Sequence, residues 1–150
     1  QPVIVENRPG AGGAVAGNTV VKSAPNSLEI FYAASPTMTI SPHVLKAMAF
    51  DPLKDMTPLA TILSYANVLV INQTQPFKPL PELVAFGKAN PGKLAYGSAG
   101  MGASNHLSGE LFARRAGITM THVPFKGSAP SILALVGGQI DLSFVASRSE

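Results

Sequence analysis

Short apolar runs alternate with amphipathic segments along the whole chain. The runs contain few polar positions, which is typical of strands that are covered on both faces of a sheet. Strands that alternate with helices in this way indicate an α/β fold with a mostly parallel sheet. The predicted strands are Val3–Val5, Leu28–Ala33, Leu59–Leu63, Val68–Ile71, Leu94–Tyr96, Thr119–Val123 and Ile140–Phe144.

The segments between these strands carry the start and stop signals of helices. Ser41 precedes a proline at the first helical position, and Gly117 follows two arginines, as expected of a helix start and a helix end. A helix in Gly13–Ser23 is the weakest prediction, because it contains poor helix formers. The predicted helices are Gly13–Ser23, Ser41 to about Met48, Pro81 to Asn90, Gly102 or Ser104 to Gly117, and Ser128–Val136.

The alternation is broken once, at Leu59–Ile71, where two predicted strands follow each other with only Ser64–Asn67 between them. A strand pair at this place can carry the chain from one lobe to another. We therefore expect a boundary near Ala66–Asn72. Residues 1–66 would form an incomplete first α/β lobe, and residues 67–150 the core of a second.

The amino-acid composition and charge exclude several classes of function. Of 150 residues, 46% are hydrophobic and 13% are charged, so the chain is apolar enough for a buried core. The net charge of +3 comes from scattered Lys and Arg with a single adjacent pair, and Trp is absent. Nucleic-acid binding is therefore not expected, and an anionic small-molecule ligand fits better. The absence of Cys excludes disulfides and thiolate metal sites.

The ends of the chain and its apolar runs bear on its location. No apolar run approaches the ~18 residues of a membrane span, so we expect a protein that is not itself membrane-spanning. The sequence contains no signal peptide and does not begin with Met. It opens almost on a predicted strand and stops just after another, so both ends look cut.

The Gly/Ser-rich turn at Gly97–Asn105 carries the clearest chemistry. It follows the strand Leu94–Tyr96 and opens onto a helix. Small residues let several backbone N–H groups approach one point, and a helix N-terminus favours negative charge there. The hydroxyls of Ser98 and Ser104 add donors. The turn predicts an anion-binding site, although a tight connection that bonds its own N–H groups would have the same composition.

A second glycine-rich loop, Gly10–Gly13, also lies between a predicted strand and a predicted helix. Together with Gly17 it resembles part of a dinucleotide-binding fingerprint, so an NAD(P)-binding α/β enzyme domain is the alternative function. That fingerprint requires an acidic residue at the end of the next strand, whereas Glu29 lies at its beginning. Gly12 and Gly13 are therefore expected in a turn or in a loop that lines a ligand cleft.

Two further polar segments follow predicted strands and would lie at the carboxyl edge of the sheet, where open α/β folds bind ligands. Ser35 and Thr37 follow the strand Leu28–Ala33, and Lys126 follows the strand Thr119–Val123. A polar turn or a solvated lysine would show the same pattern. We keep these three residues as candidate ligand contacts.

The histidines do not indicate a metal site or a nucleophile. His43, His106 and His122 are far apart, without an i+4 partner or a carboxylate cluster, so structural roles are expected. The side chains of Ser104 and His106 should diverge, because residues two apart on a helix do not face each other. Asp141 is expected at a polar edge, since an unpaired buried carboxylate is costly. No cofactor and no catalytic residue is predicted.

Several segments together resemble the substrate-binding receptors of tripartite tricarboxylate transporters, also called the Bug family. They cover nearly the whole chain in the expected order. They are Val5–Gly13 (VENRPGAGG), Phe50–Asp55 (FDPLKD), Asn67–Val70 (NVLV), Ala89–Leu94 (ANPGKL), Gly97–Gly100 (GSAG) with His106-Leu107, His122–Pro130 (HVPFKGSAP) and Gly137–Leu142 (GGQIDL).

The resemblance implies a periplasmic receptor of the type II periplasmic-binding-protein-like, bilobed architecture, present here only in part. In the family, a turn from each lobe grips a ligand carboxylate, partly through bridging waters. The first-lobe turn would lie upstream of Gln1. The second-lobe turn corresponds to Ser98, Ala99, Gly100, Met101 and Gly102 with Ser104.

The expected function is capture of a small di- or tricarboxylate, or a related organic acid, for delivery to the membrane subunits of a tripartite transporter. After the last predicted strand the family usually has Asp and Asn, whereas this chain has Val145–Arg148. A ligand contact from the last six residues is therefore not expected.

Overall fold

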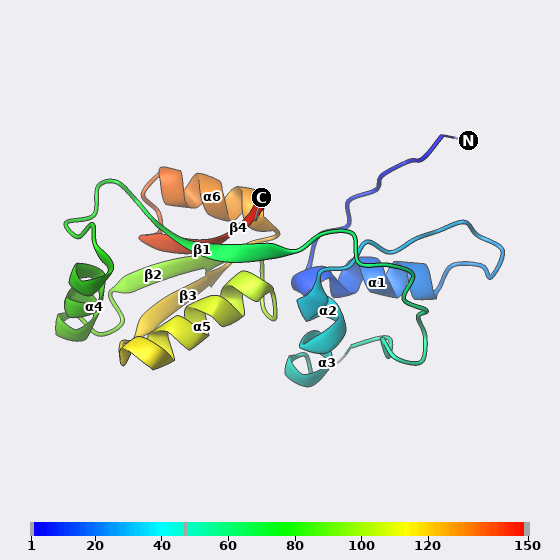
Figure 1. Ribbon diagram of the computed structural model, residues 1–150, viewed down its shortest axis with the longest axis horizontal. Helices are drawn as coiled ribbons and strands as arrows, with labels where there is room; N and C mark the ends of the chain where they lie inside the picture. Colours follow the sequence, from blue (N-terminus) through cyan, green and yellow to red (C-terminus); the bar gives the residue numbers. More distant parts are fainter. Residues whose placement is uncertain (1, 47, 149–150) are drawn as a thin grey trace.

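The computed structural model describes residues 2–46 and 48–148, arranged as two parts joined by the strand β1 (Figure 1). In the described residues the first part holds three short α-helices, one 3-10 helix and long extended segments, and the second part is a sheet with helices on both faces. In chain order the elements are η1 (Ala11–Gly13), α1 (Ala14–Val21), α2 (Ser35–Thr39), α3 (Ser41–Val44), β1 (Tyr65–Ile71), α4 (Leu80–Ala89), β2 (Leu94–Ser98), α5 (Ser104–Ala116), β3 (Met120–Pro124), α6 (Ser128–Val136) and β4 (Leu142–Arg148).

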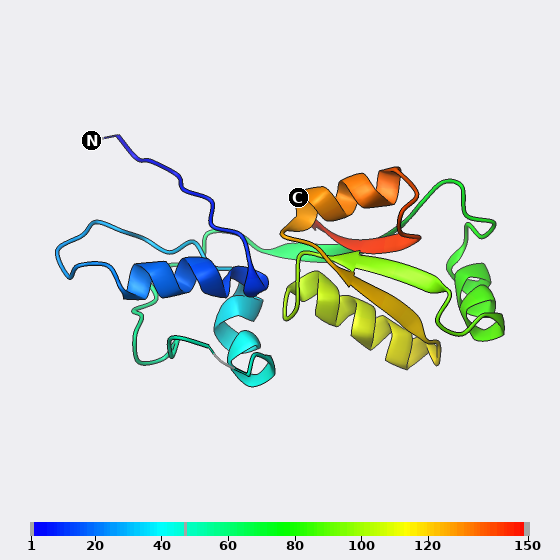
Figure 2. The same cartoon turned by 180° about the vertical axis from the view of Figure 1, so that it is seen from behind.

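The sheet has the strand order β1-β4-β2-β3. β2 runs parallel to both β3 and β4, whereas β1 pairs antiparallel with β4, with Ile71 opposite Leu142. α5 packs on one face and α6 on the other, as seen from both sides in Figure 1 and Figure 2. The prediction of an α/β fold with a mostly parallel sheet is confirmed, with one antiparallel strand at the edge.

The main core lies between the sheet and the helices α4 and α5. Tyr96 and Leu142 are fully buried at its centre, in neighbouring parallel strands. A smaller cluster under α6 contains Leu135 and Ile140. Helices on both faces explain why the strand segments read as continuous apolar runs rather than as alternating ones.

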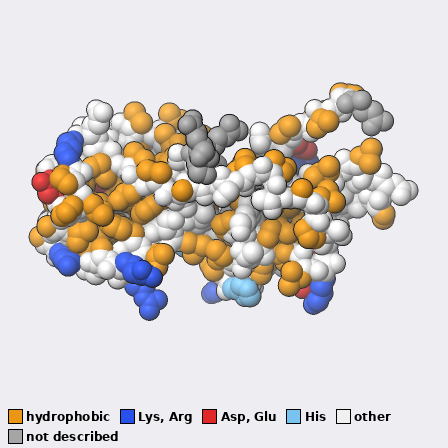
Figure 3. Space-filling model, viewed as in Figure 1, with side chains coloured by type: hydrophobic (Ala, Val, Ile, Leu, Met, Phe, Trp, Pro, Cys, Tyr) orange, Lys and Arg blue, Asp and Glu red, His pale blue; other side chains and the backbone are white. Residues whose placement is uncertain are grey.

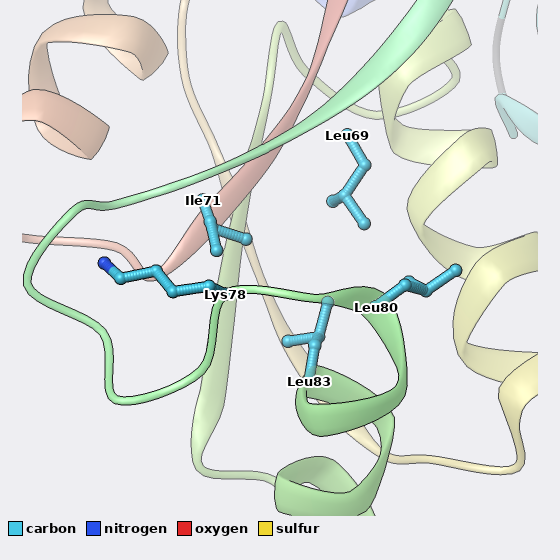
Figure 4. Close-up of a pocket in the computed structure, with 5 residues that line it drawn as sticks. All are labelled: Leu69, Ile71, Lys78, Leu80 and Leu83. Atoms are coloured by element: carbon cyan, nitrogen blue, oxygen red, sulfur yellow. The ribbon is translucent and has the colours of Figure 1, made fainter.

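A small pocket marks looser packing between β1 and α4 (Figure 4). Its volume is about 270 Å³, and Leu69, Ile71, Leu80 and Leu83 line it. Lys78 contributes its aliphatic stem, and its ammonium group donates a hydrogen bond to the carbonyl of Gln73. The pocket therefore offers an apolar wall and no free charged group.

The predicted helices of the second part are confirmed within two residues. α5 begins at Ser104, one of the two predicted starts, and α4 and α6 match their predicted segments. Gly117 ends α5 with φ 64°, a left-handed conformation that glycine adopts without steric cost. The uncertain helix in Gly13–Ser23 also forms, as α1.

Three predicted strands are wrong: Val3–Val5, Leu28–Ala33 and Leu59–Leu63 are outside every strand of the described residues. Their apolar side chains are exposed, with Val3 at 90% and Leu28 at 91%, and Figure 3 shows hydrophobic side chains spread over this part as well. A strand needs a neighbour for its backbone N–H and C=O groups, and no other described segment pairs with these three. The expected strand pair at Leu59–Ile71 is consequently a single strand, β1.

Other boundaries also differ from the predictions. Ser35 begins helix α2 rather than a turn after a strand, and the helix from Ser41 ends at Val44 instead of Met48. Ala47, within that predicted helix, lies outside the described residues. The last predicted strand is displaced, because β4 begins at Leu142 and continues through Arg148. Four of the divergent last six residues thus pair with β1, and the remaining two lie outside the described residues.

The boundary predicted near Ala66–Asn72 falls on β1, all of which pairs with β4. The division of the chain at residue 66 stays a prediction.

Candidate functional site

The turn between β2 and α5 folds back on its own side chains. The N–H of Ala99 donates to Oδ1 of Asn105 at 3.1 Å, and the N–H of Gly100 donates to Oγ of Ser98 at 3.1 Å. The N–H of Gly102 donates to Nδ1 of His106 at 3.2 Å. Three amides that the sequence suggested for an anion are therefore bonded within the protein.

A fourth N–H group of this turn, that of Ala103, donates to the carbonyl of Gly100 at 3.2 Å, and three others have no such partner in the described chain. Among the described residues, no acceptor bonds the N–H groups of Ser104 and Asn105, which begin α5, or the N–H of Met101 in the turn before it. The first N–H groups of a helix have no partner within the helix, and they lie at the positive end of its dipole. The turn thus retains donors for an anion, fewer than the sequence suggested.

The hydroxyl of Ser98 faces the interior rather than a ligand. Ser98 is 0% exposed, and its Oγ lies 2.6 Å from Nε2 of His122. This differs from the expectation that Ser98 adds a donor to the binding turn. Ser104 is partly exposed, so its hydroxyl remains accessible.

The two glycine-rich loops that the sequence suggested separately lie against each other. Thr37 donates from Oγ1 to the carbonyl of Gly12 at 2.6 Å and so ties α2 to the first loop. A Cβ at Gly12 would lie 3.0 Å from the carbonyl oxygen of Met101 and 3.4 Å from the N of Ala103. Gly12 also has φ 62°, so both its backbone angle and the close approach favour glycine.

A cavity of about 580 Å³ lies beside the start of α5. Ser104 lines it from the second part, and Ser35 and Pro36 of α2 line it from the first. Asn67 and Tyr65 of β1 form another side. The structure therefore brings Ser35 and Ser104 to one cavity, although they are far apart in the sequence.

The remaining candidate, Lys126, is not brought to this place. Its side chain is exposed, and no polar contact joins it to the turn in the described part of the chain. The neighbouring carbonyl of Phe125 approaches the turn instead, 3.5 Å from the position of a Cβ at Gly100.

Two histidines that the sequence presented as far apart are in contact. The rings of His106 and His122 have centroids 4.3 Å apart, and His122 stacks on Tyr96 at 4.9 Å. Tyr96 in turn donates to Oε1 of Glu110 at 2.5 Å. Burial lowers the pKa of both histidines below the usual 6.5, which keeps the rings neutral at pH 7. Burial and the Glu110 carboxylate raise the pKa of Tyr96.

The Ser98–His122 contact is not a nucleophile and base in this geometry. A substrate cannot reach Ser98, which is fully buried. The nearby carboxylate, Glu110, bonds Tyr96 rather than orienting His122. The contact instead fixes the end of β2 against β3. Asp141 is likewise structural: its carboxylate accepts from the N–H of Ala95 at 2.7 Å and from Gln75 at 2.6 Å.

Sequence reasoning missed two buried polar groups near the site. Asn67 donates to Oγ of Ser108 at 2.9 Å, while its Oδ1 is buried without a partner among the described residues. Ser41 is 0% exposed, and its Oγ also has no described partner; it would lie 3.4 Å from a Cβ at Gly102. Asn67 could have been noticed in the sequence, because its polar side chain interrupts the apolar run of β1. Ser41 could not, because a serine before a proline is typical of a helix start.

Other classes of site gain no support from the described residues. No cluster of three or more His, Asp or Glu side chains that could hold a metal occurs among them. None of their helices is long and apolar enough to cross a membrane. The dinucleotide alternative requires a strand directly before and directly after α1, whereas the described residues form no strand before α1 and none between α1 and α2.

Comparison with known proteins identifies relatives over nearly the whole chain. The family described as the tripartite tricarboxylate transporter family receptor matches residues 1–149. The "UPF0065 protein in gbd 5′region" of Cupriavidus necator is 39% identical over 93% of this chain, which corresponds to 42% of that protein. The chain thus spans less than half the length of this curated relative.

Solved structures agree with this result. A periplasmic transporter is 38% identical, with a TM-score of 0.92 over 97% of this chain and 49% of that one. Rpa4515 of R. palustris, solved with adipate, is 29% identical, with a TM-score of 0.86 over 95% of this chain and 48% of its own.

MatC of Rhodopseudomonas palustris, solved with bound malate, is 28% identical, with a TM-score of 0.82 over 97% of this chain and half of its own. The similarity in structure confirms the expected relation to periplasmic binding proteins. Since the family matches residues 1–149, this chain belongs to the tripartite tricarboxylate transporter receptor family.

Proposed function

We propose that this chain forms part of a periplasmic receptor that binds a small dicarboxylate, or a related organic acid, and delivers it to a tripartite membrane transporter. Its family and its likeness to proteins solved with adipate and with malate support this function. The role is binding rather than catalysis, and its partners are the ligand and the membrane subunits of the transporter.

The observation that carries the proposal is the start of α5. The N–H groups of Ser104 and Asn105 there, and that of Met101 in the preceding turn, have no acceptor among the described residues, and Ser104 borders the cavity of about 580 Å³ that it shares with Ser35. A carboxylate placed at this point would accept charge-assisted hydrogen bonds and gain from the helix dipole. Thr37 and Gly12 support the turn from the first part of the chain.

The strength of this half-site follows from its donors. Two charge-assisted hydrogen bonds at about 1.5–3 kcal/mol each, with about 1 kcal/mol from the dipole, give roughly 4–7 kcal/mol. A micromolar ligand requires about 8 kcal/mol, and binding must also overcome the loss of translational freedom. The 150-residue chain by itself should therefore bind dicarboxylates in the millimolar range.

Ser104 offers a direct test, because proline is tolerated at the first position of a helix. Ala103 before it is extended (φ −68°, ψ 156°), as a residue preceding proline must be. S104P removes the N–H donor together with the hydroxyl, whereas the matched variant S104A removes the hydroxyl alone. We expect S104P to bind malate and adipate roughly 10- to 150-fold more weakly than S104A, the equivalent of one charge-assisted hydrogen bond.

Titration followed by NMR amide shifts measures this weak binding and locates it. Both ligands should shift the amides of Met101, Ser104 and Asn105 in the wild type. Shifts confined to other parts of the chain, or equal affinity of the two variants, would contradict the proposed site. NADH added to the same sample should leave the Gly10–Gly13 amides unchanged; a saturable shift there would favour the dinucleotide alternative.

A further inference from the structure

His106 bonds the backbone of the turn Gly97–Asn105, which we call the binding turn. It lies in the first turn of α5, is 7% exposed, and accepts the N–H of Gly102 on its Nδ1 at 3.2 Å. An imidazole nitrogen that accepts a hydrogen bond carries no proton, so the neutral ring has its proton on Nε2. Gly102 lies between Met101 and Ser104, whose amides are available to an anion. The orientation of those donors therefore depends on a contact that only the unprotonated Nδ1 can make.

The groups that face this ring come from the neighbouring strands and from α5 itself. His122 of β3 contacts the ring, Tyr96 of β2 lies behind His122, and Glu110 follows one turn later on α5. β1 carries only Tyr65 as a titratable group, and the described side chains of β4 carry none. The pKa of His106 is lowered by burial and raised, to a smaller extent, by the Glu110 carboxylate.

We propose that His106 is the positioning residue of the carboxylate-binding turn, and that a proton on its Nδ1 releases Gly102 and weakens ligand binding. The proposal rests on the proposed function, because it assigns a control to that same site. It applies to ligands that use the amides of Met101 and Ser104.

The hydrogen bonds of His106 explain why its protonation should weaken, rather than strengthen, ligand binding. A proton on Nδ1 would point at the N–H of Gly102 and leave two donors facing each other, one of them buried. The positive charge would also attract a carboxylate, but Glu110 lies close enough to compensate that charge. His122 differs, because Oγ of Ser98 can accept a hydrogen bond from a protonated Nε2 as readily as it can donate to a bare one.

Three variants separate this role from general stability. H106N keeps an acceptor at the position of Nδ1 that does not titrate, and H106L removes the acceptor. H43N makes the same substitution at the exposed histidine of α3 and serves as the control. We expect H43N to bind malate within threefold of the wild type at pH 7.5, H106L to bind at least tenfold more weakly, and the conservative variant H106N to recover most of the affinity that H106L loses.

The pH profile provides the readout that a merely structural residue would not change. As the pH falls from 7.5 to the lowest value at which the chain stays folded, the malate affinity of the wild type should fall at least threefold relative to H106N. Protonation of malate itself cancels in this ratio. H43N should follow the wild type. A ratio that stays constant or rises would overturn the proposal.

A measurement on the ligand-free wild type keeps the test decisive if a variant fails to fold. Long-range ¹H–¹⁵N NMR spectra should show the proton of the neutral His106 ring on Nε2, and the Gly102 amide should titrate with that ring at a midpoint below pH 6.5. A proton on Nδ1 of the neutral ring, or a Gly102 amide that does not titrate with it, would overturn the proposal. If malate fails to bind the wild type while Gly102 titrates as expected, the proposed ligand is wrong and the control of the turn by His106 stands.

Discussion

Gly109 is the position in α5 where a single methyl group should disturb the layer beneath the binding turn. A Cβ at Gly109 would lie 2.2 Å from Cε2 of Tyr96. Tyr96 cannot move away easily, because its ring stacks on His122 and its hydroxyl bonds Glu110 at 2.5 Å. It is also fully buried. The substitution G109A therefore forces atoms together in a place with no free space.

Two opposing effects set the change in the free energy of unfolding that G109A should cause. Alanine in place of glycine in a helix interior gains about 1 kcal/mol. Inserting a methyl group into a packed core costs about 1–3 kcal/mol, and a contact of 2.2 Å belongs at the upper end of that range. We expect G109A to lower the free energy of unfolding by about 2 kcal/mol. A displaced Tyr96 should also disturb the Ser98–His122 contact.

Gly87 provides the matched control, because it is likewise a buried glycine inside a helix. A Cβ there would lie 3.1 Å from Cδ1 of Leu94 and 3.2 Å from Cδ1 of Ile118, the ends of flexible side chains, and 3.1 Å from the branch methyl Cγ2 of Ile118. These ends can shift by a few tenths of an ångström, so the gain in helix propensity should remain. We expect G87A to change the free energy of unfolding by between zero and a gain of about 1 kcal/mol.

Urea unfolding followed by far-UV circular dichroism measures both variants. With a slope of about 1–3 kcal/mol per molar urea, the midpoint of G109A should lie roughly 1 M below that of G87A. Equal midpoints, or a G109A midpoint above the wild type, would refute the reasoning that a fixed aromatic ring, rather than glycine itself, sets the cost.

Two further outcomes are expected for stability. The free energy of unfolding should fall as the pH drops below 6.5, because burial lowers the pKa of His106 and His122 in the native state and the unfolded chain therefore binds more protons in that range. Urea midpoints measured from pH 8 to pH 5 check this, and a flat profile would contradict it. S41A removes a buried hydroxyl without a described partner, so its free energy of unfolding, measured by urea unfolding, should rise by about 1 kcal/mol; a loss of that size would show that the hydroxyl is hydrogen-bonded.

Local sequence signals were enough to predict the elements of the second part. In α5, a predicted start at Gly102 or Ser104, two arginines in the last turn and Gly117 after it mark both ends of the helix, which begins at Ser104 and ends at Ala116. The strands β2, β3 and β4 overlap the apolar runs predicted for them. These signals are local, because capping, backbone preference and the spacing of apolar side chains act over a few residues.

Strand formation in the first part could not be decided from the same signals. Val3–Val5 and Leu28–Ala33 have the apolar character of strands, yet they are not in any sheet of the described residues. A strand is completed by a neighbour, and apolar composition does not say whether one is present. The side of β4 on which β1 pairs, and its antiparallel direction, were open for the same reason.

The candidate site shows the same division. The sequence located the turn at Gly97–Asn105, but only the tertiary structure revealed that its own side chains bond three of the amides. It also brought His106 against His122, and Gly12 against Met101. These contacts join residues far apart in the chain, so they depend on how helices and strands pack. Local preferences therefore fixed where the donors are, and packing decided which of them remain available to a ligand.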